Sequence, residues 1–168
     1  MADKSKVNDS ETSQGNNDIF SDNSDVFVKN DVVNLKVYYK KGGKMFDAFT
    51  EKELSERKKK NPKFDYSDYR IINLWVSPLK WGLFLQLQQD AKELDELGNA
   101  QFSSRAFKEN KLVTVIKKWD IKRTLPDGSV QEIPINIQNV SNLAPEIAET
   151  MLAAYDQYMI IDEDEEKK

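Results

Sequence analysis

The sequence predicts an α+β fold, a mainly helical small domain with a short antiparallel sheet. Some segments alternate apolar and polar residues with a period of two, which is typical of half-buried strands. Longer segments repeat apolar residues three and four positions apart, which is typical of amphipathic helices. All of these segments lie between residues 31 and 160, so we expect a single domain there, with three or four helices beside the sheet.

Both ends of the 168-residue chain are too polar to belong to that domain. Residues 1–30 contain five Ser, five Asp and five Asn, and burial of their few apolar side chains would not offset the backbone entropy lost on ordering. We therefore predict a disordered polar arm at residues 1–30. Residues 161–168 include five consecutive acidic residues and two lysines, which predict an acidic, solubilising tail.

The composition excludes several classes of function. The chain has no cysteine and no histidine, so it offers no disulfide, no thiolate or imidazole metal site and no Ser-His relay. It has no run of 18 apolar residues and no apolar signal-peptide core, so we expect neither a membrane span nor export. Residues 31–160 are nearly neutral in charge, which argues against nucleic acid as a partner.

The first predicted elements are a hairpin and a short helix. Apolar residues occupy every second position of a strand, at Val33, Leu35, Val37 and Tyr39. Gly42-Gly43 offers a turn into a second strand at residues 44–49. Thr50 and Glu53 have the spacing of a capping box, which predicts a short helix that Pro62 ends.

A buried strand and a longer helix are predicted next. The strand is the apolar run at residues 69–76. Ser77 and Pro78 then supply an N-cap and a first helical residue, and Gly98 supplies a stop. Between them, helical spacing of apolar residues runs through Leu83, Phe84, Leu87, Ala91, Leu94 and Leu97.

Two further helices are predicted on either side of a hairpin. The first covers residues 99–118, although residues 112–116 alone would also suit a strand. The hairpin consists of residues 119–123, the Asp127-Gly128 turn and a return at 130–135, which should be short or lie at a sheet edge because it contains a proline. The last helix begins near Pro145 and has an apolar face of Ile147, Met151, Ala154, Tyr155 and Tyr158.

No arrangement of residues predicts catalysis. Neighbouring carboxylates occur at Asp65 and Asp68 and at Asp95 and Glu96, but nothing in the sequence removes them from water, as acid-base catalysis needs. Residues 22–25 lack the glycine and the bidentate glutamate of a calcium loop, and the six glycines form no phosphate-binding loop. We therefore predict that the protein is not an enzyme and uses no metal and no cofactor.

The large aromatic residues admit two interpretations. Trp75, Trp81, Phe84 and Trp119 are either core residues or the lining of an exposed groove for a protein partner, since Trp and Tyr are enriched in binding hot spots. Trp81 and Leu85 fall outside the narrow apolar stripe of the predicted helix. The start of that helix is therefore apolar on more than one side. A helix that packs on the core with one face needs apolar residues on that face only.

Five short motifs, in this order, resemble the tail assembly chaperones of long-tailed bacteriophages. They are Pro-Leu-Lys-Trp-Gly at 78–82, Lys-Trp-Asp-Ile at 118–121, Pro-Asp-Gly at 126–128, Ile-Pro-Ile at 133–135 and Leu-Ala-Pro-Glu-Ile at 143–147. The similarity spans residues 69–158, and the predicted hairpin before Thr50 and the polar arm fall outside it. Ala144 stands where members of this family often have a second proline.

The resemblance implies a binding protein of the host cell cytoplasm. Members of this family coat the helical tape-measure protein and keep it soluble until the tail tube assembles. The resemblance also implies three further partners: the tail tube protein, other copies of the chaperone, and a longer form of the chaperone made by ribosomal slippage. Adenine-rich codons for Lys167-Lys168 would permit such slippage. Helix-in-groove recognition is then assigned to Trp75, Trp81, Phe84, Leu85, Trp119, Met151, Tyr155 and Tyr158.

Three alternative functions stay open at this point. A structural tail or connector protein would remain in the finished virion, whereas a chaperone would be absent from it. A host-directed adaptor or inhibitor would bind a bacterial protein instead of a phage protein. An enzyme that combines carboxylates with a divalent metal would show a metal-dependent shift in melting temperature.

Overall fold

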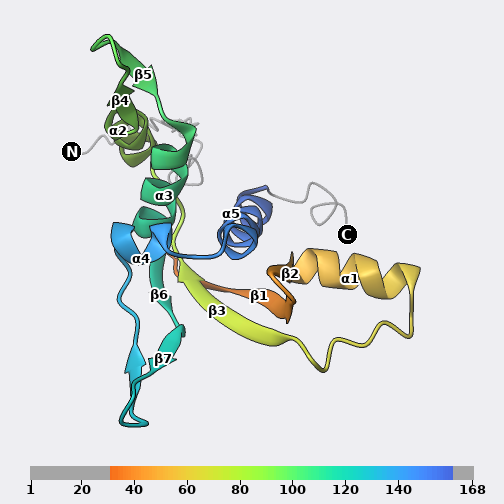
Figure 1. Cartoon of the computed structure of the whole chain (residues 1–168). Coiled ribbons are helices and arrows are strands. Elements are labelled where there is room, and N and C mark those ends of the chain that lie inside the picture. Colours follow the sequence, from red (N-terminus) through yellow and green to blue (C-terminus); the bar gives the residue numbers. More distant parts are fainter. Residues whose placement is uncertain (1–30, 161–168) are drawn as a thin grey trace, which may run out of the picture.

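The computed structural model describes residues 31–160 (Figure 1). The predicted polar arm, including residues 22–25, and the predicted acidic tail lie outside the described residues. In chain order, the elements are β1 (Val33–Gly42), β2 (Met45–Thr50), α1 (Glu51–Lys60), β3 (Arg70–Val76), α2 (Trp81–Asp90), β4 (Lys92–Leu94), β5 (Ala100–Phe102), α3 (Ser104–Val115), β6 (Ile116–Trp119), β7 (Lys122–Thr124), β8 (Val130–Glu132), α4 (Ile137–Ser141) and α5 (Pro145–Met159).

The fold is α+β, but the prediction that it is mainly helical is wrong. Helices hold 40% and strands 30% of the described residues. Four strands form an antiparallel sheet in the order β2-β1-β3-β6, and β4–β5 and β7–β8 form two separate hairpins. The helix predicted from Pro78 to residue 97 is limited to α2, because Lys80 and not Ser77 is its N-cap and because β4 follows it. The helix predicted over residues 99–118 is limited to α3, because β5 precedes α3 and β6 follows it.

A polar turn explains why the α2 helix ends early. The carboxylate of Asp95 accepts hydrogen bonds from the backbone N–H groups of Leu97 at 2.9 Å and Asn99 at 2.8 Å, and from the side chains of Asn99 and Gln101. These bonds, led by the one from the Asn99 backbone, lower the pKa of Asp95. Gly98 adopts a φ of 81°, which side-chain-bearing residues rarely do. The chain therefore reverses here, and β4 pairs with β5.

The predicted first hairpin and the capping box are both confirmed. β1 and β2 pair with Gly42 opposite Met45, and Gly43 in the turn has a φ of 67°, as two-residue hairpin turns require. The hydroxyl of Thr50 accepts the Glu53 N–H, and the Glu53 carboxylate accepts the Thr50 N–H. The box starts α1 directly after β2.

Replacing Thr50 by alanine tests the capping box. The change removes the oxygen that accepts the Glu53 N–H at 3.2 Å, so we expect the free energy of unfolding to fall by about 0.5–2 kcal/mol, the usual cost of losing an N-cap. Urea denaturation measures this change. Thr50→Ser keeps the oxygen and should be the more stable variant. Equal stability of Thr50→Ala and the parent chain would show that the box contributes nothing.

The strand β3 is buried on one face, whereas we predicted a buried strand. Ile72, Leu74 and Val76 are buried, but Ile71 is exposed and Trp75 is half-buried. Successive side chains of a strand point to opposite faces of the sheet. Because β3 pairs with both β1 and β6, its pattern shows that the sheet has one covered face and one partly open face.

Helix α5 packs against β1 and β2 and contributes to the main core (Figure 1). It begins at Pro145, as predicted, with the proline in its first turn. From α5, the core contains Ile147, Met151, Leu152, Ala154 and Tyr155. The other buried members are Val37, Ile72, Leu74, Val76, Leu112, Val115, Ile116, Trp119 and Val140. One amphipathic helix thus meets side chains from strands and helices distant in sequence.

A second, smaller cluster attaches α1 to the hairpin that precedes it. Tyr38 and Phe49 are cross-strand neighbours on β1 and β2 whose rings stack at 5.5 Å, and Leu54 from α1 completes the cluster. The Arg57 guanidinium lies 4.4 Å from the centre of the Phe49 ring and pairs with Asp47 at 3.3 Å. The short helix is thereby held by both apolar and charged contacts.

The last third contains the predicted hairpin with shorter strands, because Trp119 belongs to β6 and pairs with Leu74 of β3, and it adds one short helix. Gly128 in the β7–β8 turn has a φ of 81°, and Pro134 follows the last residue of β8, Glu132, so the return strand is short, as predicted. Helix α4 was not predicted. Asn136 caps it, because its side-chain oxygen accepts the Asn139 N–H at 2.9 Å.

Candidate functional site

Exposed apolar side chains are concentrated on α2 and the β4–β5 hairpin, residues 81–102, which we call the apolar arm. Of the fourteen large apolar side chains exposed within residues 31–160, six belong to this arm: Trp81, Leu83, Leu85, Leu94, Leu97 and Phe102. α2 packs on α3, and Figure 1 shows α2, β4 and β5 at one end of the molecule, away from α1. Soluble proteins seldom expose large contiguous apolar patches without a binding function.

Four aromatic rings connect the elements of the apolar arm to α3. Trp81 stacks on Phe84 with ring centres 5.5 Å apart, Phe84 meets Phe107 edge-on at 6.0 Å, and Phe107 meets Phe102 at 5.6 Å. We call these four residues the aromatic row. Trp81 at its end is 70% exposed. Phe102 at the other end is 57% exposed, so the row is open to solvent at both ends.

The buried Tyr155 on α5 contacts the segment that leads into the arm. Its hydroxyl accepts the backbone N–H of Leu79 at 2.8 Å, two residues before α2 begins. Burial raises the pKa of Tyr155 above its ordinary value, so the hydroxyl stays neutral. Lys80, which follows Leu79, precedes α2 without a side-chain cap. The position of Trp81 is therefore set from the core by Tyr155 and from α3 by the aromatic row.

The eight residues assigned to partner binding do not form one surface. Trp81, Phe84 and Leu85 lie together on α2, where Trp81 and Leu85 are exposed. The following three are buried in the main core: Trp119, Met151 and Tyr155. Trp75 lies half-buried on β3, where the Lys118 amine is 5.1 Å from the centre of its ring, and Tyr158 is a half-buried residue near the end of α5.

Sequence reasoning missed the contribution of β5 and α3 to this surface. Phe102 and Phe107 extend the aromatic row, but we predicted one helix over residues 99–118 that contains both and assigned neither to partner binding. The signal that favours the correct structure is the turn sequence from Asp95 to Asn99, whose Asp, Gly and Asn residues are typical of a hairpin turn.

The paired carboxylates considered as acid-base candidates have structural contacts. Asp68 pairs with Lys40 at 2.8 Å, Asp65 accepts the backbone N–H of Ser67 at 2.9 Å, and Asp95 organises the β4–β5 turn. Within residues 31–160, no three acidic side chains gather as a metal site would require. Among the same residues, none of the helices combines the length and the apolar character needed to cross a membrane.

No protein-family model matches the chain, and comparisons with curated proteins and with solved structures give no match either.

Proposed function

We propose that this protein is a tail assembly chaperone of a long-tailed bacteriophage, which binds helical segments of the tape-measure protein in the host cytoplasm and keeps that protein soluble until the tail tube assembles. The observation that carries the proposal is the exposed Trp81 at the end of the aromatic row. Tryptophan is the residue most typical of protein-binding hot spots, and an apolar surface is what the apolar stripe of a helix needs.

The positions of the motifs support the same proposal. Residues 78–82 lead into α2, residues 118–121 include the end of β6, residues 126–128 lie in the β7–β8 turn, residues 133–135 follow β8, and residues 143–147 lead into α5. Each motif therefore occurs where the chain changes direction or element. Such positions constrain the fold, so a shared order of these motifs is consistent with a shared architecture.

Co-expression with the tape-measure protein of the same phage tests the proposal directly. We expect the tape-measure protein to be insoluble when it is produced alone, and to be soluble and to co-elute with this chain in size-exclusion chromatography when both are produced. The matched control is co-expression with an unrelated acidic protein of similar size. Tape-measure protein that stays insoluble in the presence of this chain would contradict the proposal.

Mass spectrometry of purified virions separates the chaperone from a structural tail or connector protein. A chaperone is displaced during assembly, so we expect this chain to be absent from particles that contain the tape-measure protein. A fixed copy number per particle would instead identify a virion component. Capture of a defined bacterial protein, with no tape-measure protein retained, would favour a host-directed adaptor.

A further inference from the structure

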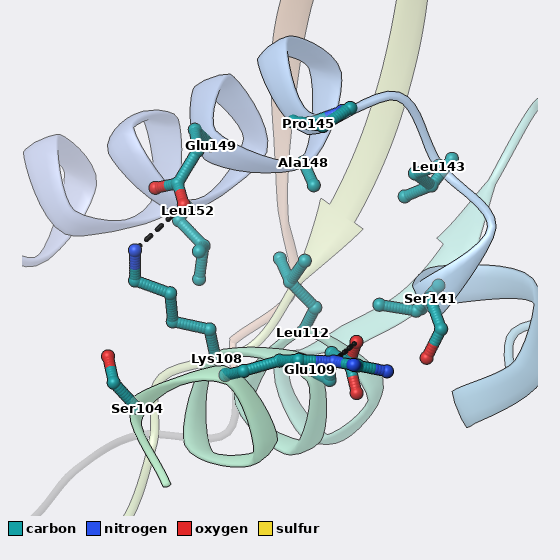
Figure 2. Close-up of a pocket in the computed structure, with 12 residues that line it drawn as sticks. Ser104, Lys108, Glu109, Leu112, Ser141, Leu143, Pro145, Ala148, Glu149 and Leu152 are labelled. Carbon is teal, nitrogen blue, oxygen red and sulfur yellow. Dashed lines mark hydrogen bonds and ion pairs between the residues drawn. The ribbon is translucent and has the colours of Figure 1, made fainter.

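Helices α3 and α5 form the two sides of a groove beside the apolar arm. Figure 2 shows α3 along one side and α5 along the other, with Leu112 and Leu152 between them. The hollow has a volume of about 420 Å³. Its floor consists of the core side chains Leu112, Val140 and Leu152, and its more exposed apolar residues are Leu143, Pro145 and Ala148. A second hollow of about 410 Å³ continues along the same helices and includes Phe107. We call the two together the α3–α5 groove, and through Phe107 it adjoins the aromatic row.

The two sides of this groove differ in charge. We call the charged residues along the α3 side the α3 lip, and those along the α5 side the α5 lip. The α3 lip consists of Arg105, Lys108, Glu109 and Lys111. The α5 lip carries Glu149 and Asp156. Glu109 bonds to Arg105 within the α3 lip at 3.0 Å, which leaves that lip with a net positive charge. The α5 lip is negative. The basic residues recur every three positions and the acidic ones are seven positions apart, so each set follows one side of its helix.

Two ion pairs cross the groove from lip to lip. Lys108 Nζ lies 2.7 Å from Glu149 Oε1, as Figure 2 shows, and Lys111 Nζ lies 2.6 Å from Asp156 Oδ1. Lys108, Glu149 and Asp156 are about half exposed, and ion pairs in contact with water contribute little to stability. The Lys111 side chain is only 16% exposed, so it needs an acidic partner whether or not a chain is bound. A bound chain that carries its own charges can therefore replace both pairs without leaving a buried charge unpaired.

We propose that the α3–α5 groove binds an amphipathic helix whose apolar stripe is flanked by acidic side chains on one side and basic side chains on the other. Leu143, Pro145 and Ala148 contact the stripe above the floor of core side chains. The acidic flank meets the α3 lip and takes over the contacts of Lys108 and Lys111, and the basic flank meets Glu149 and Asp156. The spacing of the lip charges matches the three- and four-residue spacing of a helical partner.

This inference deepens the proposed function and rests on it only in that the partner is helical. It defines which helical segments of a long partner bind here, namely those that segregate their acidic and basic residues to opposite flanks. Segments whose flanks are both acidic or both basic leave one lip facing like charges, which disfavours binding. Segments of mixed but unsegregated charge match neither lip.

Three synthetic helical peptides of equal length and with the same leucine stripe test the groove with the full-length protein. One carries Glu on one flank and Lys on the other, one carries Glu on both flanks, and one carries Lys on both. By fluorescence anisotropy, we expect the segregated peptide to bind at least about tenfold more tightly than either of the others. Equal binding by all three peptides, or binding by none, would overturn the inference.

Charge exchange across the groove supplies the matched protein variants. The double variant Lys108→Glu with Glu149→Lys keeps an ion pair but mixes the charges on each lip, so binding of the segregated peptide should fall about tenfold at unchanged melting temperature. Adding Lys111→Glu and Asp156→Lys reverses the lips, and the same peptide should bind again in the opposite direction. Unchanged binding by the double variant, or failure of the fourfold variant to recover, would contradict the groove.

The peptide-binding experiment and the co-expression experiment can fail independently of each other. If the double variant still keeps the tape-measure protein soluble while the peptides show no charge preference, the chaperone proposal stands and the groove inference fails. If the segregated peptide binds as expected but the tape-measure protein stays insoluble, the groove is a helix-binding site for another partner and the chaperone proposal fails.

Discussion

Replacing Met151 by alanine is expected to lower the free energy of unfolding by about 2–5 kcal/mol, the range for buried methionines truncated to alanine. Met151 is 0% exposed and belongs to the main core with Val37 and Leu74. The strands and α5 are held by their backbone hydrogen bonds, so they collapse only partly into the space that the side chain leaves. Alanine is a better helix former than methionine, so helix propensity does not contribute to the loss and the measured value is a lower limit for the packing term.

Met159→Ala is the matched control, because Met159 lies at the end of the same helix and is 40% exposed. We expect this variant to differ from the parent chain by less than about 0.5 kcal/mol. Urea denaturation with an unchanged slope measures both variants. If Met151→Ala were as stable as Met159→Ala, Met151 would not be a core residue, and its predicted place at the partner surface would be restored.

The apolar face of α5 shows what the sequence can and cannot predict about this site. The helical period assigns Met151, Ala154 and Tyr155 to one apolar face of α5, and the structure has them on one face. What covers that face is set by residues such as Val37 and Ile72, which are about 80–120 positions away in the chain. No local pattern records that contact, so a core face and a binding face look the same in the sequence.

Elements that depend on local chemistry were predicted best. The capping box at Thr50, the glycine turns at Gly43 and Gly128, and the proline at the start of α5 each mark a boundary. Ser77 and Pro78 do not, because α2 begins only at Trp81. The region after α2 failed because two local signals compete there. Leu94 continues the helical period, whereas the hydrogen bonds to Asp95 favour a turn, and the turn prevails.

One sequence observation did indicate the exposed surface. Trp81 and Leu85 lie outside the narrow apolar stripe, and in the structure both are exposed on α2. Within the stripe, Leu87 is buried but Leu83 is exposed as well. A helix that packs on one neighbour covers one face, so its additional apolar residues remain in water. The apolar arm therefore presents contact area that the fold itself does not use.

Replacing Trp81 by alanine is expected to weaken binding of the tape-measure protein by about 30-fold or more, the effect of losing a hot-spot side chain. The side chain is 70% exposed, so its removal affects the fold only through its stacking on Phe84, and the free energy of unfolding should change by about 1 kcal/mol or less. The measurement is the fraction of tape-measure protein that stays soluble and co-elutes with the variant.

Met45→Ala is the control for this loss, because Met45 is 64% exposed but lies on β2, outside the apolar arm. It should retain the full solubilising activity. Phe102→Ala removes the other end of the aromatic row and should weaken binding less than Trp81→Ala if Trp81 is the main anchor. Full solubilising activity of Trp81→Ala would exclude the apolar arm as the binding surface. Equal losses of activity in Trp81→Ala and Met45→Ala would indicate that solubilisation depends on the total exposed apolar surface and not on a defined site.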